Sequence, residues 1–139
     1  MKVLADTCVI IDVLQKREPF WEDAAEIFRM AATGNANICI TAKSTADIYY
    51  LMHRVTHSDI EIGKTMKKIF LLFPVLDTAG LDCQRALISE TADYEDAIMV
   101  ETALHENVDC IITRNISDYK FSPVPVYTPS DFLNITKRQ

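Results

Sequence analysis

A chain of 139 residues, of which 49% are hydrophobic, predicts one globular domain with a buried core and excludes intrinsic disorder. Its formal net charge of −6 at pH 7 argues against a protein that coats nucleic acid with a basic surface, though not against an enzyme that acts on it. No apolar run approaches the about 20 residues of a membrane helix, and no secretory signal pattern opens the chain, so we expect a cytoplasmic protein with no membrane partner.

Five short apolar runs are predicted as strands, at residues 3–5, 38–40, 73–76, 110–112 and 124–127. The runs are continuously apolar rather than alternating, which is typical of strands covered on both faces of a parallel sheet. Pro74 and Pro125 fall inside the third and fifth runs. Because proline has no N–H to donate to a neighbouring strand, these two runs are expected at the sheet edges.

Segments with a helical apolar period separate the strands. Gly34 is expected to end the first long segment, and Ser58 has the spacing of a capping box with Glu61. The predicted helices cover residues 20–31, 48–55, 58–73, 79–89 and 93–106, and a last short helix opens at 128–131. This alternation predicts a three-layer α/β/α fold with a central parallel sheet of about five strands, as a single domain over residues 1–135 followed by a frayed tail at 136–139.

Polar side chains follow two of the predicted strands at the point where each strand ends. Asp6 comes directly after the first strand, and Thr113, Arg114 and Asn115 come directly after the fourth, with Asp118 three residues further on. Ligands of parallel α/β folds bind outside the carboxyl ends of the strands. We therefore expect these side chains to border a functional site.

Two predicted helices carry acids that border their apolar faces rather than their solvent faces. Asp47 lies beside the stripe that begins at Ile48, and Asp96 precedes Val100 by four residues, with Asp93 one turn earlier. Burying several unpaired carboxylates together is costly, and a divalent cation with oxygen ligands, Mg²⁺ or Mn²⁺, resolves the repulsion. Sites of this kind suit phosphodiester hydrolysis.

Each of these acids also has a purely structural interpretation. An aspartate before a helix can cap it, and an acid in the first turn stabilises the helix. Taken singly, these alternatives are open for the caps Asp6, Asp93 and Asp118, for the first-turn acid Asp96, and for Asp47 as a solvated partner of Lys43 or Arg54. Taken together, they do not explain why acids follow two strands and border two helices.

At these residues the sequence resembles the PIN-domain family over nearly its whole length. VLADTCVIID over 3–12 looks like the first motif of the family, and ITAKSTADIYY over 40–50 is similar to the second. DYEDAI over 93–98 is similar to the third motif, and ITRNISDY over 112–119 looks like the closing one. YTPSDFL over 127–133 also resembles the usual ending of the family.

The resemblance implies a metal-dependent ribonuclease of the same α/β fold, often the toxin of a VapC-type toxin–antitoxin pair and frequently a homodimer. Its partners would be an RNA substrate and an antitoxin protein. Asp6, Asp47 and Asp96 would bind Mg²⁺ or Mn²⁺, with Asn115 and Thr113 completing the catalytic set.

Further residues are assigned by the same resemblance. Asp93 and Asp118 would lie beside the metal ligands, and Arg114, Lys43 and Arg54 would contact the RNA.

Two positions depart from the family pattern. Asp47 stands where the family usually has Glu, so its carboxylate reaches one methylene less far. Asn115 is neutral where many members carry Asp. These departures motivate a second hypothesis, a catalytically weak or inactive PIN-like module that binds nucleic acid or protein. A third hypothesis is a phosphoacceptor receiver domain. That class needs an acidic pair after the first strand and a lysine after the last, and this sequence has neither.

Overall fold

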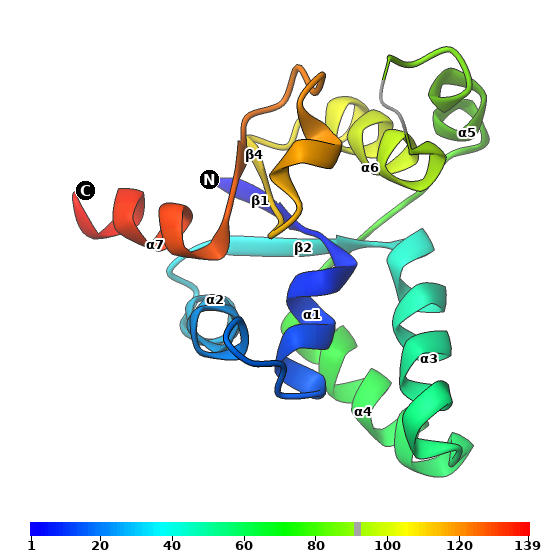
Figure 1. Ribbon diagram of the computed structural model, residues 1–139, viewed down its shortest axis with the longest axis vertical. Helices are drawn as coiled ribbons and strands as arrows, with labels where there is room; N and C mark the ends of the chain where they lie inside the picture. Colours follow the sequence, from blue (N-terminus) through cyan, green and yellow to red (C-terminus); the bar gives the residue numbers. More distant parts are fainter. Residues whose placement is uncertain (91–92) are drawn as a thin grey trace.

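A computed structural model describes residues 1–90 and 93–139 of the chain, which form an α/β fold around one parallel sheet (Figure 1). The sheet has five strands in the order β3-β2-β1-β4-β5, and every neighbouring pair is parallel. The strands are β1 (Lys2–Ala5), β2 (Asn37–Thr41), β3 (Val75–Leu76), β4 (Cys110–Ile112) and β5 (Val126–Tyr127). The predicted fold class is confirmed.

The two proline-containing runs lie at the sheet edges, as predicted, with each proline directly before its strand. The carbonyl of Pro74 accepts a hydrogen bond from Ile40 N at 3.0 Å, and the carbonyl of Pro125 accepts one from Ile111 N at 2.9 Å. Each proline thus joins the ladder through its oxygen alone. An edge position suits such a residue, because proline has no hydrogen to offer a further strand.

The predicted helices are present in the predicted order, with shifts at their ends, and one helix that was not among them, α1, precedes them. Gly34 caps α2 with a φ of 73°, a left-handed conformation that glycine adopts without strain. The last helix extends two residues into the predicted frayed tail, and the helix predicted over 79–89 ends earlier. The bounds are α1 (Thr7–Leu14), α2 (Trp21–Thr33), α3 (Ala42–Thr56), α4 (Asp59–Leu72), α5 (Gly80–Ala86), α6 (Tyr94–His105) and α7 (Pro129–Lys137), with a 3₁₀ turn η1 (Ile116–Tyr119).

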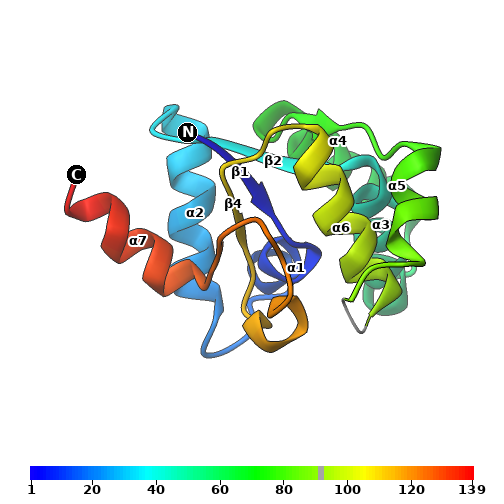
Figure 2. The same ribbon diagram turned by 90° about the horizontal axis from the view of Figure 1, so that it is seen from above.

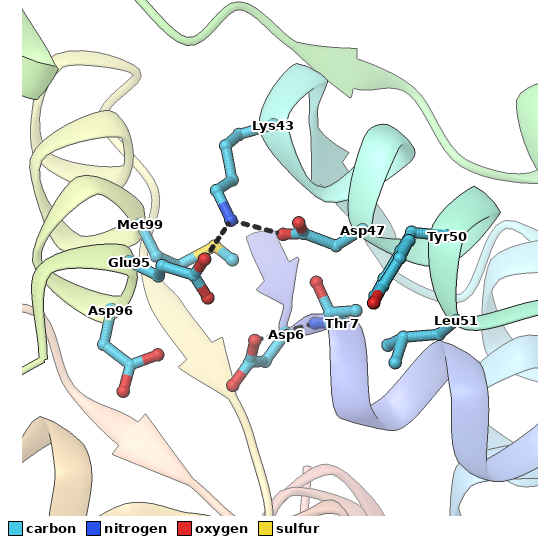
Figure 3. A pocket seen from close by; sticks show the side chains of 9 residues that line it. All are labelled: Asp6, Thr7, Lys43, Asp47, Tyr50, Leu51, Glu95, Asp96 and Met99. Carbon is cyan, nitrogen blue, oxygen red and sulfur yellow. Dashed lines mark hydrogen bonds and ion pairs between the residues drawn. The ribbon is translucent and has the colours of Figure 1, made fainter. Parts of the chain in front are cut away.

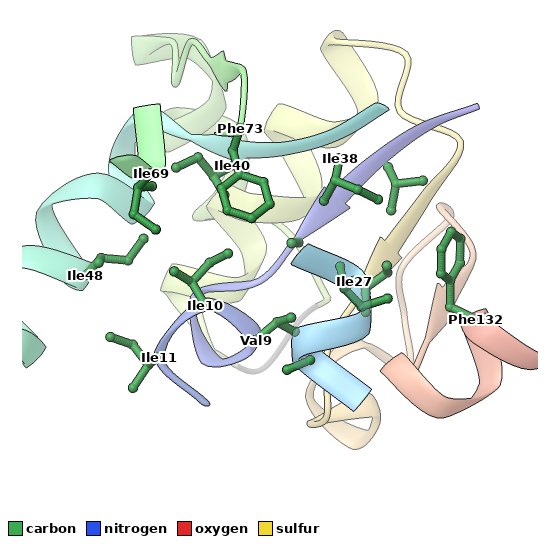
Figure 4. Packing of buried hydrophobic residues seen from close by; sticks show 14 of the residues in the cluster. Val9, Ile10, Ile11, Ile27, Ile38, Ile40, Ile48, Ile69, Phe73 and Phe132 are labelled. Atoms are coloured by element: carbon green, nitrogen blue, oxygen red, sulfur yellow. The ribbon is translucent and has the colours of Figure 1, made fainter. Parts of the chain in front are cut away.

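Both faces of the sheet are covered by helices. Val3 and Ala5 of β1 pack toward α1, α2, α3, α4 and α7 in one buried cluster, whereas Leu4 packs on the opposite face against α6. Figures 1 and 2 show α5 and α6 on the side of the sheet away from α2 and α7. The larger cluster includes the ring of Phe73 (Figure 4). This ring meets that of Phe28 edge-on, with 4.9 Å between the ring centroids.

Because all the strands run the same way, their carboxyl ends meet at one edge of the sheet. Asp6 follows β1 there, and its backbone N–H donates to the carbonyl of Ile112 at the end of β4, at 2.9 Å. α3 begins at the end of β2, where the Thr41 side chain accepts from Ser44 N. This edge therefore gathers the side chains that the sequence singled out.

None of the helices in residues 1–90 and 93–139 is long and apolar enough to cross a bilayer.

Candidate active site

A pocket opens at the carboxyl edge of the sheet, where the start of α1 meets α3 and α6 (Figure 3). Three of the acids predicted as metal ligands line it, and a fourth carboxylate, Glu95, joins them. Its lining residues are Asp6, Thr7, Lys43, Asp47, Tyr50, Leu51, Glu95, Asp96 and Met99.

Asp6 is the most buried of these acids, with 8% of its surface exposed. Its Oδ1 accepts from Thr7 N at 2.7 Å, so it also caps α1. Its Oδ2 accepts from the hydroxyls of Thr113 at 2.8 Å and Tyr119 at 3.1 Å. Burial raises the pKa of Asp6, and these hydrogen bonds partly offset the rise. Asp6 can therefore both cap α1 and serve as a metal ligand in the pocket.

Asp96 shares one hydroxyl group with Asp6. The Tyr119 hydroxyl lies 3.2 Å from Asp96 Oδ1, and the ring of Tyr119 is 2% exposed. Burial raises the pKa of Asp96 to about 7, and the negative charges of Asp6 and Asp93 add to the rise. A phenol has a single hydrogen, so it cannot donate fully to two carboxylates at once. This half of the pocket carries excess negative charge.

Asp47 lies on the other side of the pocket and is already paired with a cation. Lys43 Nζ is 2.6 Å from Asp47 Oδ2 and 3.2 Å from Glu95 Oε1, and it joins α3 to α6 across the pocket mouth. Burial alone would lower the pKa of Lys43, but its hydrogen bonds to the two carboxylates raise it. Of the two partners predicted for Asp47 in a structural role, the structure shows Lys43.

Thr113 lies beside the pocket as a supporting residue. Besides donating to Asp6, its Oγ1 accepts from Asn115 N at 3.1 Å. Asn115 itself is exposed, precedes η1, and does not line the pocket. Its predicted catalytic position is thus outside the pocket in this structure.

The acids predicted to flank the metal ligands are both exposed. Asp93 caps α6, because its Oδ1 accepts from Asp96 N at 3.1 Å. Asp118 lies in η1, and its charge contributes to the raised pKa of Asp96. The capping interpretation therefore holds for Asp93, and both residues act on Asp96 through their charge.

Two of the three cations predicted to contact RNA lie away from the pocket. Arg114 Nε donates to Asp12 Oδ2 at 2.9 Å, and its guanidinium lies 4.5 Å from the ring centroid of Phe20. Arg54 is exposed near the end of α3. Lys43, rather than Arg114, is the predicted RNA-contacting cation that lines the pocket.

The donor set fits a divalent ion at one half of the pocket. Among residues 1–90 and 93–139, no three His, Cys, Asp or Glu side chains already lie close enough together to hold a metal. Asp6 and Asp96, however, are both hydrogen-bonded to one hydroxyl group, and Mg²⁺ in enzymes is commonly held by one or two carboxylates with waters and substrate phosphates. These two residues therefore fit such an ion, whereas Asp47 is engaged by Lys43.

Sequence reasoning missed Glu95 and Tyr119. Glu95 precedes Asp96, which places it off the inward face of α6, and only its reach across to Lys43 brings it into the pocket. Tyr119 closes the last motif, where an aromatic residue reads as core packing. A buried tyrosine needs a partner for its hydroxyl, which is the signal that could have flagged it.

A comparison with models of protein families finds a match over most of the chain. The PIN domain model matches residues 2–117. The chain belongs to the PIN domain family. A comparison with curated protein sequences found no significant match.

Solved structures share the PIN fold at low sequence identity. VapBC2 from Rickettsia felis, bound to a promoter DNA fragment, matches with a TM-score of 0.70 at 15% identity, over 92% of this chain and 98% of that one. A toxin–antitoxin complex from Klebsiella pneumoniae matches with a TM-score of 0.67 at 20% identity, over 91% and 97%. VapC20 from Mycobacterium tuberculosis, described as a sarcin–ricin loop cleaving toxin, matches with a TM-score of 0.65 at 11% identity, over 88% and 98%.

Proposed function

We propose that this PIN domain is a cytoplasmic endoribonuclease that depends on Mg²⁺ or Mn²⁺ and acts as the toxin of a toxin–antitoxin pair. The observation that carries the proposal is the convergence of Asp6, Asp47, Glu95 and Asp96 from three separate segments on one pocket. One lysine does not neutralise four carboxylates, and a divalent cation would supply the missing positive charge. Family membership supports nuclease chemistry, and the solved toxin–antitoxin complexes with this fold support an antitoxin partner. A homodimer is proposed from the family resemblance alone.

Asp6 and Asp96 are proposed as the residues that hold the ion. When bound, Mg²⁺ or Mn²⁺ would lower the pKa of water and offset charge on the scissile phosphate. Thr113 and Tyr119 hold the Asp6 carboxylate by donating to its Oδ2, while its Oδ1 accepts from Thr7 N. Asp93 holds the first turn of α6 and therefore the position of Asp96.

Not all of the residues predicted to contact RNA are proposed for that role. Arg54 is exposed on α3 and free to meet a phosphate, whereas Arg114 is paired with the buried Asp12. The pocket wall also offers Tyr50, a largely exposed ring on which a base could stack. Asn115 and Asp118 lie on the exposed η1 side, where they would meet the substrate or waters rather than the ion.

Cleavage of a mixed single-stranded RNA with Mg²⁺, Mn²⁺ or EDTA tests the proposal. Wild type should cut RNA only with a metal, and Asp96→Asn should lose cleavage, because the substitution removes one of the two carboxylates while keeping the oxygen that Tyr119 contacts. Asp23→Asn, an exposed acid in the first turn of α2, is the matched control and should cut normally. A DNA oligonucleotide of the same sequence tests the preference for RNA.

A second function is favoured by one specific observation, the ion pair between Lys43 and Asp47. A lysine paired with Asp47 in place of a metal ion would suit a module that binds nucleic acid or protein without cutting. Absence of cleavage by the wild type with both metals, together with no effect of either metal on its melting temperature, would favour this alternative.

A further inference from the structure

The four carboxylates of the pocket fall into two pairs with different partners, and Lys43 reaches only one of these pairs (Figure 3). On one side, Asp6 and Asp96 share only the neutral hydroxyl of Tyr119. On the other side, Asp47 and Glu95 share an ammonium group at 2.6 and 3.2 Å. The four carboxylates are therefore not equivalent as metal ligands.

Two features restrict the position of this lysine, a hydrogen bond of its backbone and the partial burial of its side chain. It lies in the first turn of α3, and its backbone N–H donates to Thr78 Oγ1 at 3.2 Å. Its side chain is 26% exposed and that of Asp47 is 34% exposed, so the pair is partly shielded from solvent. Partly shielded pairs are screened less by salt than fully exposed ones.

A divalent ion that bound Asp47 and Glu95 would have to displace this ammonium. Two-metal nucleases use a second ion to stabilise the leaving oxygen, with the ions about 3.5–4 Å apart. A fixed ammonium beside the same carboxylates supplies one positive charge at that place without an ion. It also repels a second cation from the neighbouring position.

We infer that Lys43 takes the place of a second metal ion, so that this chain binds one divalent cation, at Asp6 and Asp96, and holds Asp47 and Glu95 with its own ammonium. The inference rests on the proposed function, because it assumes that the pocket binds a metal. It assigns Lys43 as a positioning residue for Asp47 and Glu95 and as the determinant of metal stoichiometry, rather than as a contact to RNA.

Counting bound Mn²⁺ tests this inference without relying on catalysis. Metal-free full-length protein is titrated with Mn²⁺ at pH 8, and free Mn²⁺ is followed by electron paramagnetic resonance. Wild type should bind one ion per chain, and Lys43→Met should bind two, because methionine keeps an unbranched side chain of nearly the same length and removes its charge. Lys43→Arg should bind one, because it keeps the charge.

Two further variants separate a local effect from a general change of charge. Lys64→Met removes an exposed lysine paired with Glu61 on α4, and it should bind one ion. Lys43→Met combined with Glu95→Gln should return from two ions to one, because the second ion loses a ligand. Circular dichroism spectra that match the wild type confirm that each variant is folded.

The outcomes distinguish the inference from the function on which it rests. Two ions on the wild type, or one ion on Lys43→Met, would overturn the role of Lys43 while leaving a metal-dependent nuclease intact. No ion on the wild type and one on Lys43→Met would show that Lys43 blocks the pocket, which also overturns the one-ion assignment. No ion on either protein would sink both the inference and the proposed function.

Discussion

The hydroxyl of Tyr119 donates to Asp6 Oδ2 at 3.1 Å, although 113 residues separate the two side chains in the sequence. The hydroxyl oxygen of Tyr119 also lies 3.2 Å from Asp96 Oδ1, so one buried phenol joins the residue after β1 and the first turn of α6 to η1. Because the negative charges of Asp6 and Asp96 disfavour the phenolate, the pKa of Tyr119 lies far above its ordinary value, burial being the largest cause. The group therefore stays a hydrogen-bond donor at every physiological pH.

Tyr119→Phe should lower the free energy of unfolding of the metal-free protein by about 1–3 kcal/mol, the usual cost of losing a hydrogen bond to a charged, buried group. The ring stays in place, so the loss reports on the hydroxyl alone. Urea unfolding in EDTA measures it. Tyr127→Phe, which removes a hydroxyl from a half-buried ring on β5, is the matched control, and an equal loss in both variants would argue against a special role for Tyr119.

Asp96→Asn should stabilise the metal-free protein at pH 8. The folded pKa of Asp96 is raised from 3.8 to about 7, so its contribution to stability is fully present below about pH 4 and is lost as the pH rises through 7. Above pH 7 the ionised carboxylate of Asp96 destabilises the folded protein, and the neutral side chain of asparagine removes this destabilisation. The expected gain in the free energy of unfolding is on the order of 1–2 kcal/mol after allowance for solvent screening. The gain should vanish near pH 4.

Urea unfolding in EDTA at pH 4 and pH 8 measures the difference between wild type and Asp96→Asn. Added Mg²⁺ should reverse the order at pH 8, because an ion that binds the folded wild type stabilises it by mass action. A variant that is less stable than the wild type at pH 8 in EDTA would contradict the assignment of Asp96 as a strained carboxylate.

Removing Arg114 should destabilise the fold more than neutralising its partner. Asp12 is 1% exposed, and its Oδ1 has no hydrogen-bond partner among the described residues, so Arg114 supplies its only counter-charge there. Arg114→Met leaves a buried, unpaired carboxylate and should cost about 3–5 kcal/mol. Asp12→Asn should cost less, because the freed guanidinium is 25% exposed and can be hydrated. Urea unfolding measures both losses, and equal losses of unfolding free energy in the two variants would contradict this prediction.

His105 should make stability depend on pH above neutrality. Its Nδ1 lies 2.8 Å from Oδ1 of Asp82, and this hydrogen bond is the main cause that raises the pKa of His105. The resulting stabilisation is full below about pH 6.5 and is lost as the pH rises through the folded pKa. The imidazole is 31% exposed, so the pair should contribute no more than about 1 kcal/mol.

The measurement for this pair is the difference in unfolding free energy between wild type and His105→Gln at pH 5.5 and pH 8.5. The difference should be larger at the lower pH. His57→Gln, an exposed histidine at the end of α3, controls for the general effect of losing an imidazole. A difference that grows with pH would reverse the sign and refute the raised pKa.

The order of elements could be read from local patterns because each pattern has a local cause. Continuously apolar runs marked the strands of a sheet covered on both faces, and Pro74 and Pro125 marked its edges because proline cannot donate to the ladder. Gly34 marked a helix end because its φ of 73° is open to glycine. Helix ends without such a residue, as in α5, were predicted less well.

The approach of Asp6, Asp47 and Asp96 follows from local patterns, because parallel strands bring their carboxyl ends to one edge and the helical period turns the other acids inward. The partners of charged groups that are far apart in the sequence could not be predicted in this way. Arg114 is 102 residues from Asp12 in the sequence, and no periodicity relates residues so far apart. Pairing of long side chains depends on distances of a few ångströms and on which groups are dehydrated together, and these quantities exist only once the chain has folded.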